Sequence, residues 1–381
     1  MDCMAQRRWR ALAGLLISGT VSICSAAAGP FSNMVVFGDS LSDVGNLQAE
    51  WFINTPGPYY WNGRFSNGPV YAETVMTGLG LPALNHSSAD GTDYAYGGAK
   101  TTGTSFPDSI FVSDVDDQVS SYLSSFTPNA STLYVVLAGA NDLLQGQTNM
   151  SVPVNSLQTS INSLISAGAR KFLVINLPPL GDTPRFNTSA SDMSTYNLRS
   201  QQYNSALAAM VASTHTSHPT TTFYQYDLTA LFNQALANPA LYGLVNVTNS
   251  SAPGLEPGDT SYDTSQEVPN PNQYLFWDDL HPTANVHAIL GRRVLDLFFP
   301  PGDYNRDVAT DDGDYVLLRK GLGTTYQPID YNIWRAHFGQ TTPGSGSSLG
   351  DTFEVTVPEP GGMLLGAFAL SLLFIRVPRT G

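Results

Sequence analysis

The stretch Phe37-Gly38-Asp39-Ser40-Leu41-Ser42-Asp43-Val44-Gly45-Asn46 follows the short apolar run Met34-Val35-Val36. The apolar run has the length of a buried strand, so we expect Ser40 to lie just past the strand end. Loops at that end of an α/β sheet stay open to solvent on a rigid scaffold, and active sites are common there. A serine hydroxyl is a weak nucleophile until a base takes its proton, so the rest of the chain must supply one.

A candidate base lies near residue 280, in the stretch Phe276-Trp277-Asp278-Asp279-Leu280-His281-Pro282-Thr283. An imidazole accepts a proton near neutral pH, and a carboxylate bonded to its other nitrogen fixes the tautomer and stabilises the cation. The spacing of Asp278 and His281 suits this pairing. The alternative interpretation is a helix that starts here with Pro282 in its first turn, and the two interpretations are compatible.

Two further segments offer groups that could bind an oxyanion. They are Tyr96-Gly97-Gly98-Ala99 and Gly139-Ala140-Asn141-Asp142, the second of which follows the apolar run 133–137. A glycine lets the backbone approach a ligand closely, and an asparagine amide offers two donors. Each segment could instead be an ordinary turn, and Ser40, Asp39 and Asp43 could be turn or helix-capping residues.

The order Gly-Asp-Ser-Leu-Ser, Gly-Gly-Ala, Gly-Ala-Asn-Asp and Asp-x-x-His-Pro-Thr resembles the GDSL family of SGNH hydrolases over about residues 33–299. The resemblance implies Ser40 as nucleophile, His281 as base and Asp278 as its orienting partner. It implies Gly98 and Asn141 as oxyanion donors beside the Ser40 N–H, with Gly97 as the alternative glycine. It also implies a serine hydrolase that cleaves carboxylic esters through an acyl-enzyme without a catalytic cofactor. The Phe-Trp-Asp-x-x-His-Pro-Thr form is similar to that of lipase-like members, which favours lipid or short acyl esters.

The apolar runs 34–37, 133–137, 172–176 and 222–226 have strand length and alternate with longer amphipathic stretches at helical spacing. Near-continuous apolarity is typical of strands that are covered on both faces. The pattern predicts a three-layer α/β/α sandwich around a mostly parallel sheet, with the site at the strand carboxyl ends. Segments 51–60 and 246–274 are expected to be long loops. The aromatics Tyr59 and Tyr60, with the adjacent Trp61, could contact substrate or pin a loop to the core.

The composition excludes one class of partner. The chain has 381 residues with 17 basic and 31 acidic side chains, for a formal charge of −14. Such a chain is not expected to bind nucleic acid, which requires basic phosphate contacts.

The first residues predict a signal peptide over 1–28 and therefore export. They contain Arg7, Arg8 and Arg10, then the apolar run 11–23 and a small-residue site. Cys24 allows a lipoprotein anchor as the alternative.

The other end carries Val357-Pro358-Glu359-Pro360, an apolar run over 361–375 and then Arg376 and Arg379. This trio resembles the PEP-CTERM sorting signal of Gram-negative exosortase systems. The resemblance implies processing by sorting machinery, retention at the membrane and a cell-surface or extracellular enzyme. A plain C-terminal membrane anchor is the alternative.

Between these parts, Asp303, Asn305, Asp307, Asp311 and Asp314 place oxygen side chains at loop positions 1, 3, 5, 9 and 12, as calcium requires. The stretch 314–319 is echoed by 330–335, and this repeat resembles a dockerin type I module that would attach the enzyme to a partner. Val308 stands where such a loop normally turns on glycine, and the second repeat lacks ligands. The alternative is a solvated acidic linker.

These features predict five segments: a signal peptide (1–28), a hydrolase domain (29–300), a dockerin-like helical module with a calcium loop (301–340), a linker (341–356) and a sorting signal with an apolar helix (357–381). Three other functions stay open. The chain could be a non-catalytic surface protein that binds glycan, or a polysaccharide deacetylase of the same fold. Metal-dependent hydrolysis through Asp278, Asp279 and His281 is the third, although no further ligand cluster is evident.

Overall fold

The computed structural model describes residues 29–50, 55–105 and 108–343, so the predicted signal peptide and sorting signal lie outside the described residues, as does most of the linker. Four strands form one parallel sheet in the order β1 (Asn33–Gly38), β2 (Thr132–Leu137), β3 (Lys171–Ile175) and β4 (Thr222–Tyr226). Every residue of β2 is buried, as the near-continuous apolar run predicted.

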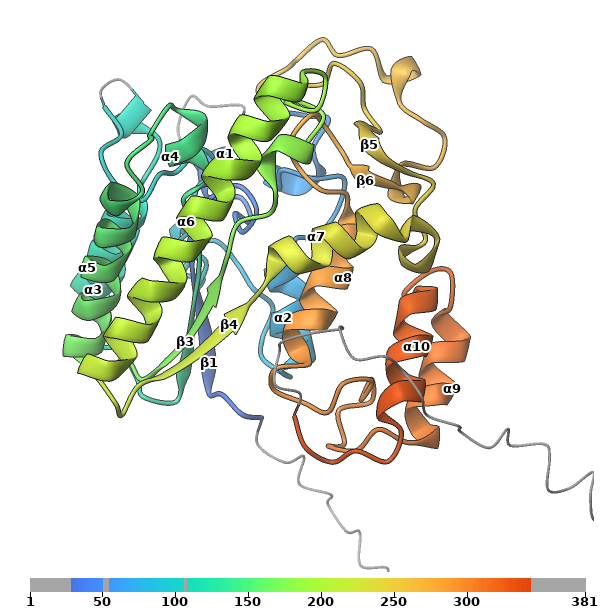
Figure 1. Ribbon diagram of the computed structural model, residues 1–381. Coiled ribbons are helices and arrows are strands. Elements are labelled where there is room, and N and C mark those ends of the chain that lie inside the picture. Colours follow the sequence, from blue (N-terminus) through green and yellow to red (C-terminus); the bar gives the residue numbers. More distant parts are fainter. Residues whose placement is uncertain (1–28, 51–54, 106–107, 344–381) are drawn as a thin grey trace, which may run out of the picture.

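Helices cover both faces of this sheet (Figure 1). On one side lie α3 (Val115–Ser125), α5 (Ser151–Ala167) and α6 (Ala190–Ser217), and on the other lie α2 (Tyr71–Gly78), α7 (Leu228–Ala237) and α8 (Ala284–Leu295). The predicted three-layer arrangement with a parallel sheet is confirmed. Its core joins strand residues such as Tyr134 and Phe172 to apolar helix faces, for example Leu157 of α5 and Ile289 of α8.

Short elements connect the layers and carry the strand-end loops. The short α-helices are α1 (Asn46–Ala49) and α4 (Ala140–Leu144). The 3-10 turns are η1 (Trp61–Gly63), η2 (Ser87–Ala89), η3 (Asp108–Ile110), η4 (Leu180–Asp182), η5 (Pro239–Tyr242), η6 (Thr264–Gln266) and η7 (Pro271–Gln273).

The segment 246–274 differs from the expected long loop. It begins with β5 (Asn246–Ser250), which pairs in parallel with β6 (Tyr274–Phe276) in a separate two-stranded sheet. No residue of β5 is buried, so its polar sequence lacks the alternation that marks a half-buried strand. The pairing with β6 therefore defines this strand, and pairing between distant segments is not visible in a local pattern.

Helix α8 also starts later than the sequence suggests. Pro282 lies before the helix, which begins at Ala284. The reason is a tight loop, because the Trp277 N–H donates to the His281 carbonyl at 2.7 Å and the Thr283 N–H donates to the Leu275 carbonyl at 3.1 Å. This loop folds back on β6 and carries His281 at its tip.

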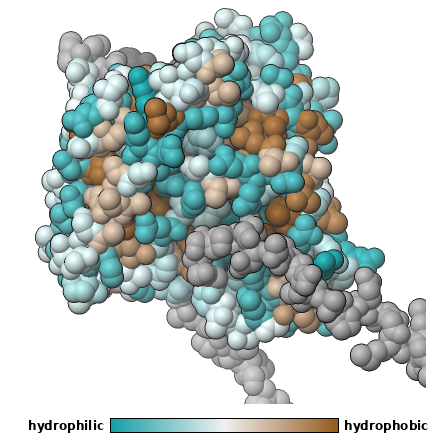
Figure 2. All heavy atoms as spheres, viewed as in Figure 1, coloured by the Kyte–Doolittle hydropathy of each residue, from teal (hydrophilic) through white to brown (hydrophobic). Residues whose placement is uncertain are grey.

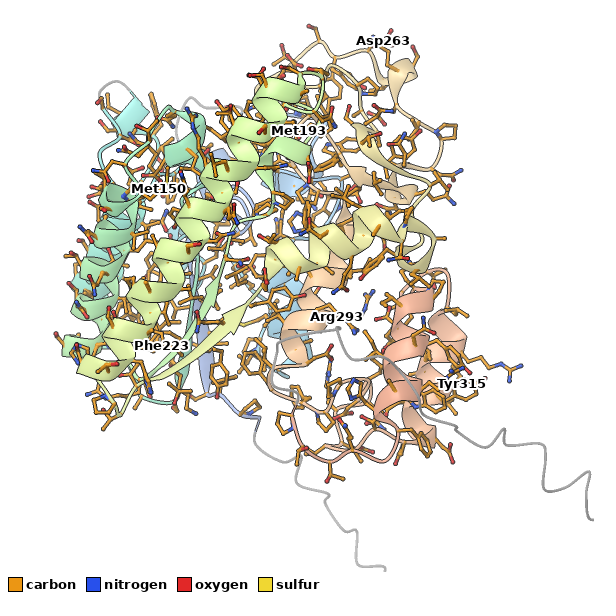
Figure 3. All side chains as sticks on the ribbon, viewed as in Figure 1. Met150, Met193, Phe223, Asp263, Arg293 and Tyr315 are labelled. Atoms are coloured by element: carbon orange, nitrogen blue, oxygen red, sulfur yellow. The ribbon has the colours of Figure 1, made fainter. Side chains whose placement is uncertain are left out.

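The repeated sequence forms a helix pair, α9 (Asp312–Gly321) and α10 (Pro328–His337), beside α8 (Figure 1). Asp314 and Asp330 occupy equivalent places, and each carboxylate accepts the N–H of the residue three positions earlier. Asp330 also accepts hydrogen bonds from Arg292 and Arg293 of α8, at 3.1 and 2.7 Å. Figure 3 shows Arg293 between α8 and α10. The pair thus packs directly on the α/β body.

The surface is mixed in character. The face seen in Figure 2 is mainly hydrophilic, with hydrophobic residues in separate small groups. Within the described ranges, none of the helices combines the length and apolarity needed to cross a bilayer.

Candidate active site

Ser40 and His281 meet although 241 residues separate them in the sequence. Ser40 lies in the loop after β1, and His281 lies in the loop before α8. The Ser40 Oγ is 2.9 Å from His281 Nε2, and His281 Nδ1 is 2.7 Å from Asp278 Oδ2. All three side chains are buried, with 8% of Ser40 exposed. The structure therefore brings the three predicted residues into one hydrogen-bonded chain.

Asp278 is held by four hydrogen bonds. Its Oδ1 accepts the backbone N–H groups of Leu280 (2.8 Å) and His281 (2.6 Å), and its Oδ2 accepts the imidazole Nδ1 and the Tyr60 hydroxyl, both at 2.7 Å. Burial acts to raise the pKa of Asp278, but the His281 charge and these hydrogen bonds outweigh it and hold that pKa below its usual range. An ionised Asp278 accepts a hydrogen bond from the Nδ1–H group of His281, which leaves Nε2 unprotonated and able to accept the serine proton.

The two predicted oxyanion donors line the same cleft as Ser40. Gly98 has φ +81°, a conformation that favours glycine, and its N–H has no acceptor among the described residues. The Gly97 N–H instead donates to Asp43 Oδ2 at 2.8 Å. The backbone geometry therefore favours Gly98 over Gly97 as a donor to a ligand.

Asn141, in the first turn of α4, donates one amide hydrogen to the Ala99 carbonyl at 2.9 Å. This bond fixes the orientation of the amide and leaves its second hydrogen for a ligand. The Ser40 N–H also lacks an acceptor in the part of the chain that the structure describes. Three donors from three separate segments thus border one cleft.

The cleft over the triad has a volume of about 480 Å³, within the range of small-molecule sites. Its walls are largely apolar, formed by Leu47, Phe65, Phe111, Val112, Leu144, Pro257 and Leu280. The Phe65 ring lies 5.1 Å from the His281 ring and packs against it. An apolar cleft that ends at a serine, an imidazole and free N–H groups can bind an acyl chain and polarise its carbonyl.

The buried carboxylates of Asp39 and Asp43 accept hydrogen bonds from backbone N–H groups of the loop that carries Ser40. Asp43 accepts the N–H groups of Gly45 and Asn46 on one oxygen, so it does cap this turn, as the alternative interpretation held. Burial raises the pKa of Asp39 to about 7 and that of Asp43 to about 6. Asp39 Oδ1 accepts the Leu41 N–H at 3.1 Å, whereas its buried Oδ2 has no partner among the described residues.

Two residues at the site were not assigned to it by sequence reasoning. Tyr60, considered as a substrate or core contact, is bonded to Asp278 instead of facing the cleft as an open stacking surface. Arg185 lines the cleft and binds Asp279 through two hydrogen bonds of 2.8 Å. Asp279 is therefore occupied by a guanidinium group, which argues against its use as a metal ligand. Neither partner could be found from the sequence, because no local pattern links such distant positions.

The predicted calcium loop uses its oxygens internally. Asp303 accepts the N–H groups of Arg306 and Val308, and Asp314 accepts those of Tyr304, Asn305 and Asp311. Asn305 and Asp307 bond to each other, and Asp311 accepts the Gly313 N–H. Across residues 29–50, 55–105 and 108–343, no group of three or more His, Cys, Asp or Glu side chains is arranged to hold a metal ion. The calcium site stays a prediction.

One family model covers more than half of the chain. The model of the GDSL-like Lipase/Acylhydrolase family matches residues 34–294. The chain is 27% identical to a phosphatidylcholine-sterol acyltransferase of Aeromonas hydrophila, over 68% of this chain and 88% of that protein. It is 27% identical to a GDSL esterase/lipase of Arabidopsis thaliana, over 79% of this chain and 97% of the relative. A solved structure from the lipolytic G-D-S-L family of Veillonella parvula is 14% identical, with a TM-score of 0.41 over 70% of this chain and 97% of its own.

Proposed function

The chain belongs to the GDSL-like lipase/acylhydrolase family and is an esterase or lipase, and from this premise we propose that it cleaves carboxylic esters through an acyl-enzyme on Ser40. The observation that carries the proposal is the hydrogen-bonded chain Ser40–His281–Asp278, of which Ser40 and His281 line an apolar cleft. A serine in contact with an oriented imidazole is the arrangement that activates a hydroxyl as a nucleophile.

In the proposed first half-reaction, Ser40 Oγ forms a bond to the ester carbonyl carbon as its proton passes to His281 Nε2. The negative charge that develops on the carbonyl oxygen is stabilised by the N–H groups of Ser40 and Gly98 and by the free amide hydrogen of Asn141. The carbon–oxygen bond to the alcohol then breaks, and His281 gives its proton to the leaving oxygen. In the second half-reaction water attacks the acyl-enzyme by the same route.

Lipid or short acyl esters are the favoured substrates. The apolar walls of the cleft suit an acyl chain, because burial of each methylene group contributes roughly 0.8 kcal/mol. The relative named phosphatidylcholine-sterol acyltransferase adds support for a phospholipid ester. A polysaccharide deacetylase would differ in accepting only acetyl groups, so a series of acyl lengths separates these substrate classes.

The test is hydrolysis of p-nitrophenyl esters from acetate to palmitate by the purified protein, with the variants Ser40→Ala and His281→Ala. We expect both substitutions to abolish turnover, and we expect a fluorophosphonate to label the wild type stoichiometrically at Ser40. Unchanged rates in either variant would reject the mechanism. A wild type that folds but neither turns over nor accepts the label would favour the non-catalytic surface protein.

We also propose that the enzyme is exported and held at the cell surface by its C-terminal segment. The support lies in the signal-like N-terminus and in the apolar run that follows Pro-Glu-Pro. Expression of the full chain in a Gram-negative host, with cell fractionation and sequencing of the mature N-terminus, tests both parts. A new N-terminus near Gly29 is expected, and a cytoplasmic protein that keeps Met1 would contradict the proposal.

A further inference from the structure

Tyr60 contacts the acid of the triad from a distant part of the chain. Its side chain is 5% exposed, and its hydroxyl donates to Asp278 Oδ2 at 2.7 Å across 218 residues of sequence. The same oxygen accepts the His281 Nδ1 hydrogen bond, also at 2.7 Å. Two hydrogen bonds of equal length therefore end on one carboxylate oxygen.

The ring of Tyr60 is fixed by its surroundings. It belongs to a small buried cluster with Ala252, Leu255 and Trp277, the last of which directly precedes Asp278. Phe65, from the same segment as Tyr60, packs against the Tyr60 ring at 6.1 Å and against the His281 ring at 5.1 Å. The segment 60–65 therefore contacts both the acid and the base of the triad.

We propose that Tyr60 is a positioning residue that holds Asp278 in place and weakens the pull of its carboxylate on the His281 imidazolium. This inference rests on the mechanism proposed above. A hydrogen bond to a carboxylate draws negative charge away from the oxygen that accepts it. The oxygen that stabilises the imidazolium is the one that Tyr60 binds, so loss of this bond makes the imidazole hold its proton more tightly.

The other titratable groups around the pair stay in place when only the Tyr60 hydroxyl is removed. Asp39 faces His281 from the loop after β1, and His287 faces it from α8. Arg185 and Glu256 contribute charge near Asp278 from their own loops, and Asp279 does so from the same loop as Asp278. A shift caused by removal of one hydroxyl can therefore be assigned to the bond with Asp278.

The experiment compares the pH dependence of kcat/KM for the wild type, Tyr60→Phe and Tyr59→Phe. Tyr59 is the matched control, because it is adjacent, partly exposed and bonded only to the Thr260 carbonyl at 3.3 Å among the described residues. In Tyr60→Phe we expect the acidic limb of the profile to move to higher pH by about half a unit. At a fixed pH on that limb, kcat/KM would then be roughly threefold lower than in the wild type. We expect kcat at the plateau to fall about 3- to 10-fold, since Asp278 is less firmly oriented. Tyr59→Phe should match the wild type.

A second substitution keeps the test decisive if Tyr60→Phe does not fold. Incorporation of 3-fluorotyrosine at position 60 makes the phenol a stronger donor, so the limb should move to lower pH. The low-field proton resonance of His281 Nδ1–H provides a readout without turnover, and it should move further downfield in Tyr60→Phe. The inference would be overturned if the acidic limb and the His281 Nδ1–H resonance both stayed at their wild-type positions in whichever of the two altered proteins folds. A wild type whose activity does not depend on Ser40 would instead reject the proposed function.

Discussion

The second amide hydrogen of Asn141 is available at the cleft, because the Ala99 carbonyl takes only the first. We expect Asn141→Ala to lower kcat about 10²–10³-fold with little change in KM, since this donor would act mainly on the charge that develops in the transition state. Steady-state kinetics on the preferred p-nitrophenyl ester measures the loss. Asn155→Ala, at an exposed position of α5, is the control and should leave the rate unchanged. A loss of less than threefold in Asn141→Ala would contradict the role of the amide.

Asp39 makes stability depend on pH near neutrality. Burial raises the pKa of Asp39 to about 7 in the folded protein, well above its value of 3.8 in an exposed chain. Between these two values the folded state binds a proton that the unfolded state has lost, so stability falls as pH rises. From pH 5 to pH 8 we expect the free energy of unfolding to drop by about 2–3 kcal/mol through this group.

Urea unfolding at pH 5 and pH 8 measures this change, and Asp39→Asn, which cannot ionise, should make the dependence shallower. Asp43, with a pKa of about 6, contributes in the same direction and should still do so in the variant. Asp278 acts oppositely, because its lowered pKa stabilises the fold at neutral pH and this contribution is lost in acid. Equal slopes in the wild type and Asp39→Asn would show that Asp39 is not the source.

For single residues, the sequence predicts a functional role where residue types with a specific chemistry occur in a recognisable order. Ser40, His281 and Asp278 belong to such a pattern, and the structure brings them together. The choice between Gly97 and Gly98 depended on a hydrogen bond to Asp43, which no spacing reveals. The bond between Tyr60 and Asp278 could not be predicted for the same reason. The sequence around an aromatic loop residue is the same whether its side chain contacts a substrate, the core or a carboxylate.

Among the elements, the loop before α9 contains a backbone position that suits glycine. Val308 has φ +73°, where a β-branched side chain is crowded, and the side chain is 48% exposed. We expect Val308→Gly to raise the free energy of unfolding by about 1 kcal/mol, since glycine adopts this conformation without the steric penalty. Val316→Gly, at an exposed position within α9, should lower it by roughly 0.5 kcal/mol, since glycine has a lower helix propensity than valine. Urea unfolding of both variants tests the pair, and a loss of stability in Val308→Gly would contradict the argument.

Strands could be predicted where burial appears in the sequence as an unbroken run of apolar residues. Strands β1 to β4 appear as short runs between helical stretches, and the central pair is buried on both faces. β5 has no such signal, because its side chains are partly exposed and its pairing depends on β6. The start of α8 was misplaced because bonds between Trp277 and His281 and between Leu275 and Thr283 compete with a helix at Pro282.

In the whole molecule, the helix pair α9–α10 is joined to the α/β body by buried charge. Asp330 is fully buried, and both Arg292 and Arg293 of α8 bind its carboxylate while it also accepts the Gln327 N–H. The equivalent residue of the first repeat, Asp314, binds only backbone groups among the described residues. The two equivalent acids thus have different partners: Asp314 binds backbone groups of its own loop, and Asp330 binds two guanidinium groups of the body.

This junction predicts that the body and the helix pair unfold together. Asp330→Ala leaves two buried guanidinium groups without their shared partner, and we expect a loss of about 3–5 kcal/mol in the free energy of unfolding. Urea unfolding of the chain from residue 29 should show one transition by near-ultraviolet circular dichroism and by esterase activity, at a lower midpoint in the variant. Asp312→Ala, an exposed acid in the first turn of α9, is the control and should change stability by less than about 1 kcal/mol. If activity survived to the wild-type midpoint in Asp330→Ala while another transition appeared at lower urea, the helix pair would be a separate unit and the buried ion pairs would not couple it to the catalytic body.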